Sequence, residues 1–229
     1  MGDLSILMPV FNERATVRDA VGQVLATPFP LDEVELLIVD DGSTDGSAEV
    51  LAELGAHPRV EVLSHERNLG KGAAIRTALQ RATGTYSAVM DADLEYNPAD
   101  IATLLEPLIE GKAAAVFGAR GFEAHSAYNF WYVVGNKVVT FCANLLYNSW
   151  VSDIMTGQKV IRTDLLRSLP LRESGFGIEP EITAWLLRRS VRIYEVPVHY
   201  RARSRAEGKK LTMLDGLRVL RTLVRCRIR

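Results

Sequence analysis

The sequence predicts an α/β protein built on an open, mainly parallel sheet with helices on both faces. Short apolar runs alternate with stretches of helical periodicity four times before Gly118, and the connections between them are short. Polar and acidic residues follow directly where several of the runs end. Ligands bind beyond the carboxyl ends of the strands in sheets of this kind, so these residues indicate a site.

Strands are expected where apolar residues run without interruption, and helices where they recur every three or four residues. The strands expected before Gly118 cover residues 4–10, 34–39, 60–63, 86–90 and 114–118. The helices expected between them cover residues 16–26, 47–54, 72–82 and 98–110. Pro28 and Pro30 close the first helix, and Pro98 opens the last, where its missing N–H does no harm.

The regular alternation stops beyond Gly118. Helices are expected at 129–147, 164–169, 179–189 and 214–229, and strands at 158–161 and 193–198. We expect most of the aromatic-rich helix 129–147 to pack as a core helix over the sheet, with a contact surface as the alternative. One face of the last helix carries Leu217, Leu220, Leu223 and Val224, and the other carries five arginines. Such a helix lies on an anionic membrane, or docks on the protein with its charged face in water.

The composition is that of an ordinary soluble domain. The 229 residues are 48% hydrophobic and 24% charged, with a net charge of −1, so no overall charge favours nucleic acid. We expect one domain over 1–229, made of two halves (1–120 and 121–210) and the basic amphipathic helix (211–229). Neither a leader pattern nor a long apolar segment is seen, which predicts a cytoplasmic protein, with a peripheral place at the membrane face as the alternative.

Three carboxylates, Asp91, Asp93 and Glu95, follow the strand expected at 86–90. Carboxylates this close repel one another and raise each other's pKa unless a cation lies between them. Mg²⁺ and Mn²⁺ prefer oxygen ligands and leave positions open for phosphates. Taken alone, these residues fit a divalent metal site and a solvated acidic loop equally well, and the rest of the chain has to decide between them.

Other strand ends bring further polar groups to the same edge of the sheet. Glu13 and Asp41 end the first two strands, and Arg120 follows the fifth. A basic segment comes later, with Arg203, Lys209 and Lys210. Carboxylates with a metal and basic side chains together clamp a diphosphate, and Asp41 could accept hydrogen bonds from a base or ribose. The glycines around Lys71 fit neither a P-loop nor a dinucleotide fingerprint.

The chain resembles the family 2 glycosyltransferases with the GT-A fold, whose first half is Rossmann-like. Within them it is most similar to the polyprenyl-phosphate sugar synthases of the dolichol-phosphate mannose synthase type. The shared motifs are Pro9–Glu13, Val39–Gly46, Asn68–Gly72, Asp91–Leu94, Gly118–Arg120, Ser152–Asp153, Gly175–Phe176 with Glu179 and Glu181, and Glu195–Pro197. Each is short, but their order and spacing are specific and cover nearly the whole chain.

The resemblance implies an inverting transfer of a hexose from a nucleoside-diphosphate sugar, with Mg²⁺ or Mn²⁺. It implies that Asp91 and Asp93 bind the metal, with Glu95 as a third candidate where many relatives have glutamine. Residues implied for the nucleoside and for the donor are Pro9, Phe11, Glu13, Val39, Asp41, Asp91 and Ala92. Residues implied for phosphates are Arg120, Arg203, Lys209 and Lys210. The candidate catalytic residues are Asp93, Arg120 and Asp153.

The chemical class of the acceptor follows from whether its attacking oxygen must lose a proton. A hydroxyl acceptor needs a general base, for which Asp153 is the candidate, unless it is only a turn residue. A phosphate monoester is already largely ionised at neutral pH and needs cations instead, which the segment 201–210 supplies. We therefore expect a polyprenyl-phosphate acceptor. A soluble small-molecule nucleophile, or an inactive nucleotide-sugar-binding subunit, are the alternatives.

Overall fold

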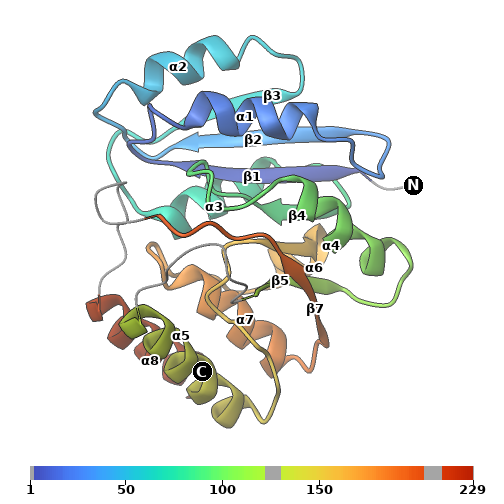
Figure 1. The fold of residues 1–229 in the computed structure, drawn as a ribbon, viewed down its shortest axis with the longest axis vertical. Helices are drawn as coiled ribbons and strands as arrows, with labels where there is room; N and C mark the ends of the chain where they lie inside the picture. Colours follow the sequence, from blue (N-terminus) through green and yellow to red (C-terminus); the bar gives the residue numbers. More distant parts are fainter. Residues whose placement is uncertain (1–2, 122–129, 204–212, 229) are drawn as a thin grey trace.

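A computed structural model gives the fold of residues 3–121, 130–203 and 213–228 (Figure 1). The strands are β1 Leu4–Val10, β2 Val34–Asp40, β3 Val60–Ser64, β4 Tyr86–Val89, β5 Ala115–Arg120, β6 Lys159–Arg162 and β7 Ile193–Val198. The helices are α1 Val17–Ala26, α2 Ser47–Leu54, α3 Lys71–Arg81, α4 Ala99–Ile109, α5 Phe130–Tyr147, α6 Thr163–Ser168, α7 Ile178–Arg188 and α8 Met213–Ile228. The predicted α/β class is confirmed, and element boundaries agree to within one or two residues.

All of these strands join one sheet in the order β3-β2-β1-β4-β6-β5-β7. Neighbouring strands are parallel except at β6, which runs antiparallel to both β4 and β5. The parallel pairs bring the carboxyl ends of β1, β2 and β4 to one edge. The sheet also unites the two predicted halves of the chain, because β6 and β7 lie beyond residue 120.

Two apolar clusters cover the two faces of the sheet. Leu7 of β1 belongs to the cluster beneath α3 and α7, whereas Ile6 and Met8 belong to the cluster beneath α1 and α4. Strands covered on both faces read as continuous apolar runs, which is why the first strand was visible in the sequence. The sheet is therefore a buried platform, and its polar groups gather at the strand ends.

Helix α5 corrects the sequence-based expectation of a core helix. Only Val139, Thr140 and Ala143 of α5 are buried, and the helix packs against α8 and α7 (Figure 1). Three of its aromatic side chains face outward, with Phe130 68%, Trp131 69% and Phe141 66% exposed, whereas Tyr147 packs against the core. Aromatic content predicted burial, but α5 meets its neighbours through a narrow strip of small and β-branched side chains.

Helix α8 docks, but through a different face from the one predicted. Its buried residues are Val219, Thr222, Leu223 and Cys226, while Leu217 and Val224 are exposed. Of the predicted apolar stripe only Leu223 is fully buried. The face of α8 that contacts α5 and α7 is rotated about the helix axis relative to that stripe. No helix among residues 3–121, 130–203 and 213–228 is long and apolar enough to cross a membrane.

Glycines allow close contact where the start of α3 meets the segment before α7. A Cβ added to Gly72 would clash with the main-chain oxygen of Glu173, and one added to Gly70 would clash with that of Ser174. Gly70 also has a φ of +96°, which side chains rarely adopt. This junction therefore admits no side chain.

We predict that Gly72→Ala lowers the free energy of unfolding by about 1–3 kcal/mol, since the methyl group meets main-chain atoms that cannot turn aside. The matched control is Gly22→Ala in the middle of α1, where a Cβ has nothing within 4 Å. That change should stabilise the protein by roughly 0.5–1 kcal/mol through helix propensity. Urea unfolding of the two variants tests the pair, and equal effects would contradict the close contact.

Candidate functional site

The site is built from the ends of β1, β4 and β5 and from the segment that follows β7. Glu13 follows β1, and Asp91, Asp93 and Glu95 follow β4. The chain beyond β7 comes back over these ends (Figure 1), and Arg201 N–H donates to the main-chain oxygen of Glu95 at 2.8 Å. Arg201 and Arg203 of the predicted basic segment therefore lie beside the acidic strand ends, and residues 204–210 of that segment lie outside the described residues.

Arg203 lies among three of these carboxylates. Its guanidinium contacts Glu13 at 3.1 Å, Asp93 at 2.7 Å and Glu95 at 3.3 Å. All four side chains are at most 16% exposed. Ion pairs with so little solvent interact strongly, so Arg203 is held firmly at the mouth of the acidic cluster.

Asp93 is the carboxylate most affected by the crowding. Burial, and then the charges of Asp91 and Glu95, raise the pKa of Asp93 to about 7, although Arg203 acts in the opposite direction. Arg203 therefore offsets only part of what burial and the neighbouring carboxylates do to Asp93. A divalent cation would offset the rest, and the oxygen donors of Asp91 and Asp93 suit Mg²⁺ or Mn²⁺.

Asp91 belongs to a second ion-pair group, centred on Lys71 at the start of α3. The Lys71 ammonium lies 2.8 Å from Asp91 and 2.6 Å from Glu179 in the first turn of α7. Burial by itself lowers the pKa of Lys71, but the two carboxylates outweigh it and raise the pKa above its ordinary value. One oxygen of Glu179 is buried without a hydrogen-bond partner. Lys71 therefore links the end of β4 to the start of α7.

Arg120 forms the third group, with Asp153 and Tyr200. Its guanidinium donates two hydrogen bonds to Asp153, at 2.5 and 3.0 Å, and its Cζ lies 4.8 Å from the centre of the Tyr200 ring. Asn136 of α5 donates to Asp153 as well, at 3.1 Å. Burial raises the pKa of Asp153, but the arginine outweighs it and the net shift is downward. Asp153 is thus a stable anion and a weak proton acceptor.

Three residues predicted to contact the donor are turned into the protein instead. Val39 and Ala92 lie within the apolar clusters, so their side chains offer no surface to a ligand. Asp41 is 2% exposed and accepts hydrogen bonds from the main chain of Leu69 and Gly70, at 2.9 and 2.7 Å. Its carboxylate also contacts His65 Nδ1 at 2.6 Å. A donor could meet these positions only through main-chain atoms, whereas Pro9 and Phe11 are half-buried.

The three carboxylates after β4 do not gather as one ligand set. Among the described residues, no three His, Cys, Asp or Glu side chains are grouped so that they could hold a metal ion. The oxygens of Glu95 face Tyr200 and Arg203, and a role for Glu95 as a third metal ligand stays a prediction. Asp91 and Asp93 also have cationic partners, in Lys71 and Arg203, and a divalent ion would share their oxygens with these side chains.

The set of predicted site residues and the set that the structure brings together are not the same. Lys209 and Lys210, expected to bind phosphates, lie outside the described residues. Sequence reasoning did not select Tyr200 or Lys71, although Lys71 stands in a glycine-bounded motif before a helix. It also missed Lys159, whose buried ammonium donates to the oxygens of Ile154 and Thr156, and whose pKa burial lowers to about 7.

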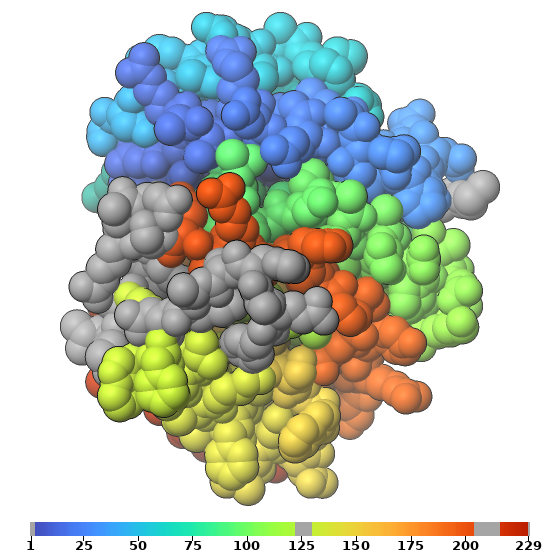
Figure 2. All heavy atoms as spheres, viewed as in Figure 1, coloured from blue at the N-terminus to red at the C-terminus, as the bar shows by residue number. Residues whose placement is uncertain are grey.

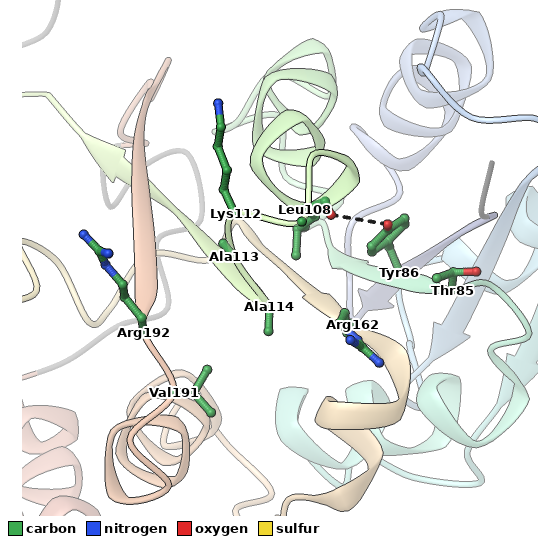
Figure 3. A pocket seen from close by; sticks show the side chains of 10 residues that line it. Thr85, Tyr86, Leu108, Lys112, Ala113, Ala114, Arg162, Val191 and Arg192 are labelled. Carbon is green, nitrogen blue, oxygen red and sulfur yellow. Dashed lines mark hydrogen bonds between the residues drawn. The ribbon is translucent and has the colours of Figure 1, made fainter.

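A separate hollow of about 560 Å³ lies at the opposite edge of the sheet, between the start of β4, the end of α4 and the loop before β7 (Figure 3). It carries Lys112, Arg162 and Arg192 at its border. The charged ends of these side chains point in different directions (Figure 3) rather than toward a common centre. The hollow therefore does not share the chemistry of the carboxyl edge.

We predict that Lys71→Met lowers the free energy of unfolding by about 3–5 kcal/mol, because it leaves the charges of Asp91 and Glu179 buried without their cation. Arg81→Met is the matched control, since its ion pair with Glu61 is solvent-exposed. Removing that pair should cost about 0–1 kcal/mol. Chemical denaturation of both variants measures the difference, and a Lys71→Met protein as stable as the control would contradict the buried role of Lys71.

The fold is that of the GT-A glycosyltransferases. In its complex with UDP, glucosyl-3-phosphoglycerate synthase from Mycobacterium tuberculosis matches 99% of this chain and 80% of its own, with a TM-score of 0.77 and 23% identity. The complex of that enzyme with Mn²⁺, UDP-glucose and phosphoglyceric acid gives a TM-score of 0.75 at the same identity and coverage. At this identity the likeness establishes the fold alone.

Similar sequences include the glycosyltransferase AglJ of Haloferax volcanii, 28% identical over 214 residues, which span 93% of this chain and 67% of AglJ. The dolichol-phosphate mannosyltransferase of Pyrococcus furiosus is 26% identical over 210 residues, covering 90% of this chain and 58% of that protein. The hexosyltransferase Agl6 of Haloferax volcanii is 28% identical, with 96% and 53% covered. The chain thus spans about half to two thirds of these relatives.

The model of glycosyl transferase family 2 matches residues 5–169, which is most of the chain and includes Glu13, Asp91, Asp93, Arg120 and Asp153. Those residues are also the ones that the fold brings to the carboxyl edge of the sheet. The chain belongs to glycosyl transferase family 2.

Proposed function

We propose that the protein is an inverting glycosyltransferase that moves a hexose from a nucleoside-diphosphate sugar to a polyprenyl phosphate. The observation that carries this proposal is the contact of Asp93 with Arg203, next to Glu95, which also binds Tyr200 beneath Arg120. Negative and positive groups side by side can bind a diphosphate through a metal on one side and directly on the other. Family membership and relatives that include a dolichol-phosphate mannosyltransferase support the same reading.

The donor end of the site would work through charge. Asp91 and Asp93 would hold Mg²⁺ or Mn²⁺, which neutralises charge that develops on the leaving diphosphate. Arg203 and Arg120 would bind the phosphate oxygens, with Lys209 and Lys210 of the basic segment as further candidates. Both arginines lie within little-exposed surroundings, where such contacts are stronger than in water.

The contacts of Asp153 favour a phosphate acceptor over a hydroxyl. A general base needs a pKa near the working pH and a free lone pair toward the acceptor. Asp153 has a lowered pKa and accepts from Arg120 and Asn136. The ionised oxygen of a phosphate monoester needs no base. Asp153 would then orient Arg120.

The outer faces of α5 and α8 suit an acceptor that is held in a membrane. Figure 2 shows α5 (yellow-green) at the surface, and exposed apolar residues lie on both helices and after α5. These residues are Phe130, Trp131, Val138, Phe141, Leu145, Trp150, Leu217, Val224 and Ile228. Arg218, Arg221 and Arg227 of α8 are exposed as well. Aromatic side chains with neighbouring arginines favour the interface of an anionic bilayer.

We predict that Asp93→Ala abolishes hexose transfer to polyprenyl phosphate, a loss of at least about a hundredfold. The substitution removes a proposed metal ligand and one of the carboxylates that pair with Arg203. Asp164→Ala, at an exposed carboxylate on α6, should keep the activity. Mass spectrometry of products from UDP- and GDP-sugars with Mn²⁺ measures the transfer, and an Asp93→Ala protein with full activity would contradict the assignment. Products formed only on a soluble hydroxyl compound would replace the lipid acceptor, and donor binding without turnover would point to an inactive subunit.

We also predict that Trp131→Ser with Phe141→Ser weakens binding to anionic vesicles by roughly tenfold or more, since burying one such side chain contributes about 1.5–3 kcal/mol. Ile109→Ser on α4, an exposed apolar residue away from α5 and α8, is the control and should bind as the parent does. Co-sedimentation with vesicles of anionic and of neutral lipid measures the effect. Equal binding by the parent and the double variant would remove α5 from the membrane contact.

A further inference from the structure

The segment 200–203, which we call the strap, crosses the site and is fastened by Glu95. Tyr200 O–H donates to Glu95 Oε2 at 2.7 Å, and Arg203 N–H donates to Glu95 Oε1 at 3.0 Å. Arg203 Nε donates to the same oxygen at 3.3 Å. Both carboxylate oxygens of Glu95 are therefore engaged by residues more than a hundred positions later in the chain.

The turn before Glu95 is shaped for these contacts. Leu94 has a φ of +60°, a left-handed conformation that is unfavourable for a side chain of this size. Glu95 N–H donates to Asp93 Oδ1 at 3.1 Å, which closes the turn. Asp93 and Glu95 thereby approach the strap together, and Glu95 is only 11% exposed.

The strap carries or supports both arginines of the proposed diphosphate clamp. Arg203 is part of it. Arg120 is not, but its guanidinium lies over the ring of Tyr200, whose hydroxyl is fixed by Glu95. The centre of the Tyr200 ring lies 5.0 Å from that of Tyr96, with the ring planes tilted by 47°, at a β-bridge between the two segments. Moving Glu95 would therefore disturb two cations on separate parts of the chain.

We propose that Glu95 is a positioning residue that holds Arg203 directly, and Arg120 through Tyr200, for the diphosphate of the donor. This rests on the proposed function. Asp93 is assigned to the metal and Glu13 to the nucleoside, so Glu95 is the neighbour of Arg203 left to anchor it while the donor is bound. A carboxylate suits this place because it accepts from three donors, whereas a glutamine offers one acceptor oxygen.

The anchor can be tested without activity, because two strap amides bond to Glu95 in different ways. Arg203 N–H bonds to its side chain, whereas Arg201 N–H bonds to its main-chain oxygen. In Glu95→Ala, hydrogen exchange followed by NMR should show the Arg203 amide exchanging about tenfold faster, with Arg201 little changed as the internal control. In Glu95→Gln, the exchange rate of the Arg203 amide should lie between those of the parent and of Glu95→Ala. An Arg203 amide unchanged in both variants would overturn the anchor, whatever the activity.

The functional consequence is read from kinetics at saturating Mn²⁺. Glu95→Ala should raise the KM for the donor sugar roughly tenfold while the Mn²⁺ concentration for half-maximal rate stays the same, and Glu95→Gln should recover part of the loss. Tyr200→Phe should reproduce part of the effect, and Glu106→Ala, at an exposed glutamate on α4, none of it. A shifted Mn²⁺ requirement with recovery at high Mn²⁺ would make Glu95 a metal ligand and overturn the proposal. If the parent transfers no sugar, the proposed function fails, and the amide exchange still decides the anchor.

Discussion

The crowding of carboxylates at one edge of the sheet is the constraint on which this structure depends. Glu13, Asp91, Asp93 and Glu95 stand at the ends of two neighbouring parallel strands, largely removed from water. Isolated charges in such a place cost several kcal/mol each, so each needs a cation close by. Burial and the neighbouring charges of Asp91 and Glu95 raise the pKa of Asp93, although Arg203 lies beside it. A bound cation would therefore lower the free-energy cost of keeping these carboxylates ionised.

The cations come from distant parts of the chain, so the site also holds the fold together. Lys71 joins Asp91 of one half to Glu179 of the other, and Arg203 reaches Glu13 across 190 positions. Arg225 of α8 contacts Glu173 and Glu181, beside the junction where α3 begins. The proposed catalytic roles and the structural roles therefore fall on the same group of ion pairs. Substitutions in the site therefore need a stability measurement beside any activity measurement.

Most of the fold could be predicted because buried parallel strands have a plain signature. The run from Leu4 to Val10 is apolar on both faces, and Glu13 after it marks the carboxyl edge. The direction of β6 could not be predicted, because a four-residue apolar strand reads the same in either direction. The exposure of α5 was also missed. Its burial depends on which face meets α8, and the composition of α5 alone does not carry that information.

For the candidate site, residue types could be predicted but partners could not. Asp91 and Glu95 are four positions apart and look alike in the sequence, yet Asp91 contacts Lys71 and Glu95 contacts Tyr200 and Arg203. A local pattern shows that carboxylates are crowded. It does not show which cation each one meets, because that depends on where the chain returns a hundred residues later. The returning strap engages both oxygens of Glu95, and its Arg203 also contacts Asp93, while Asp91 contacts Lys71. The partner of each carboxylate is therefore set by the tertiary fold and not by the local sequence.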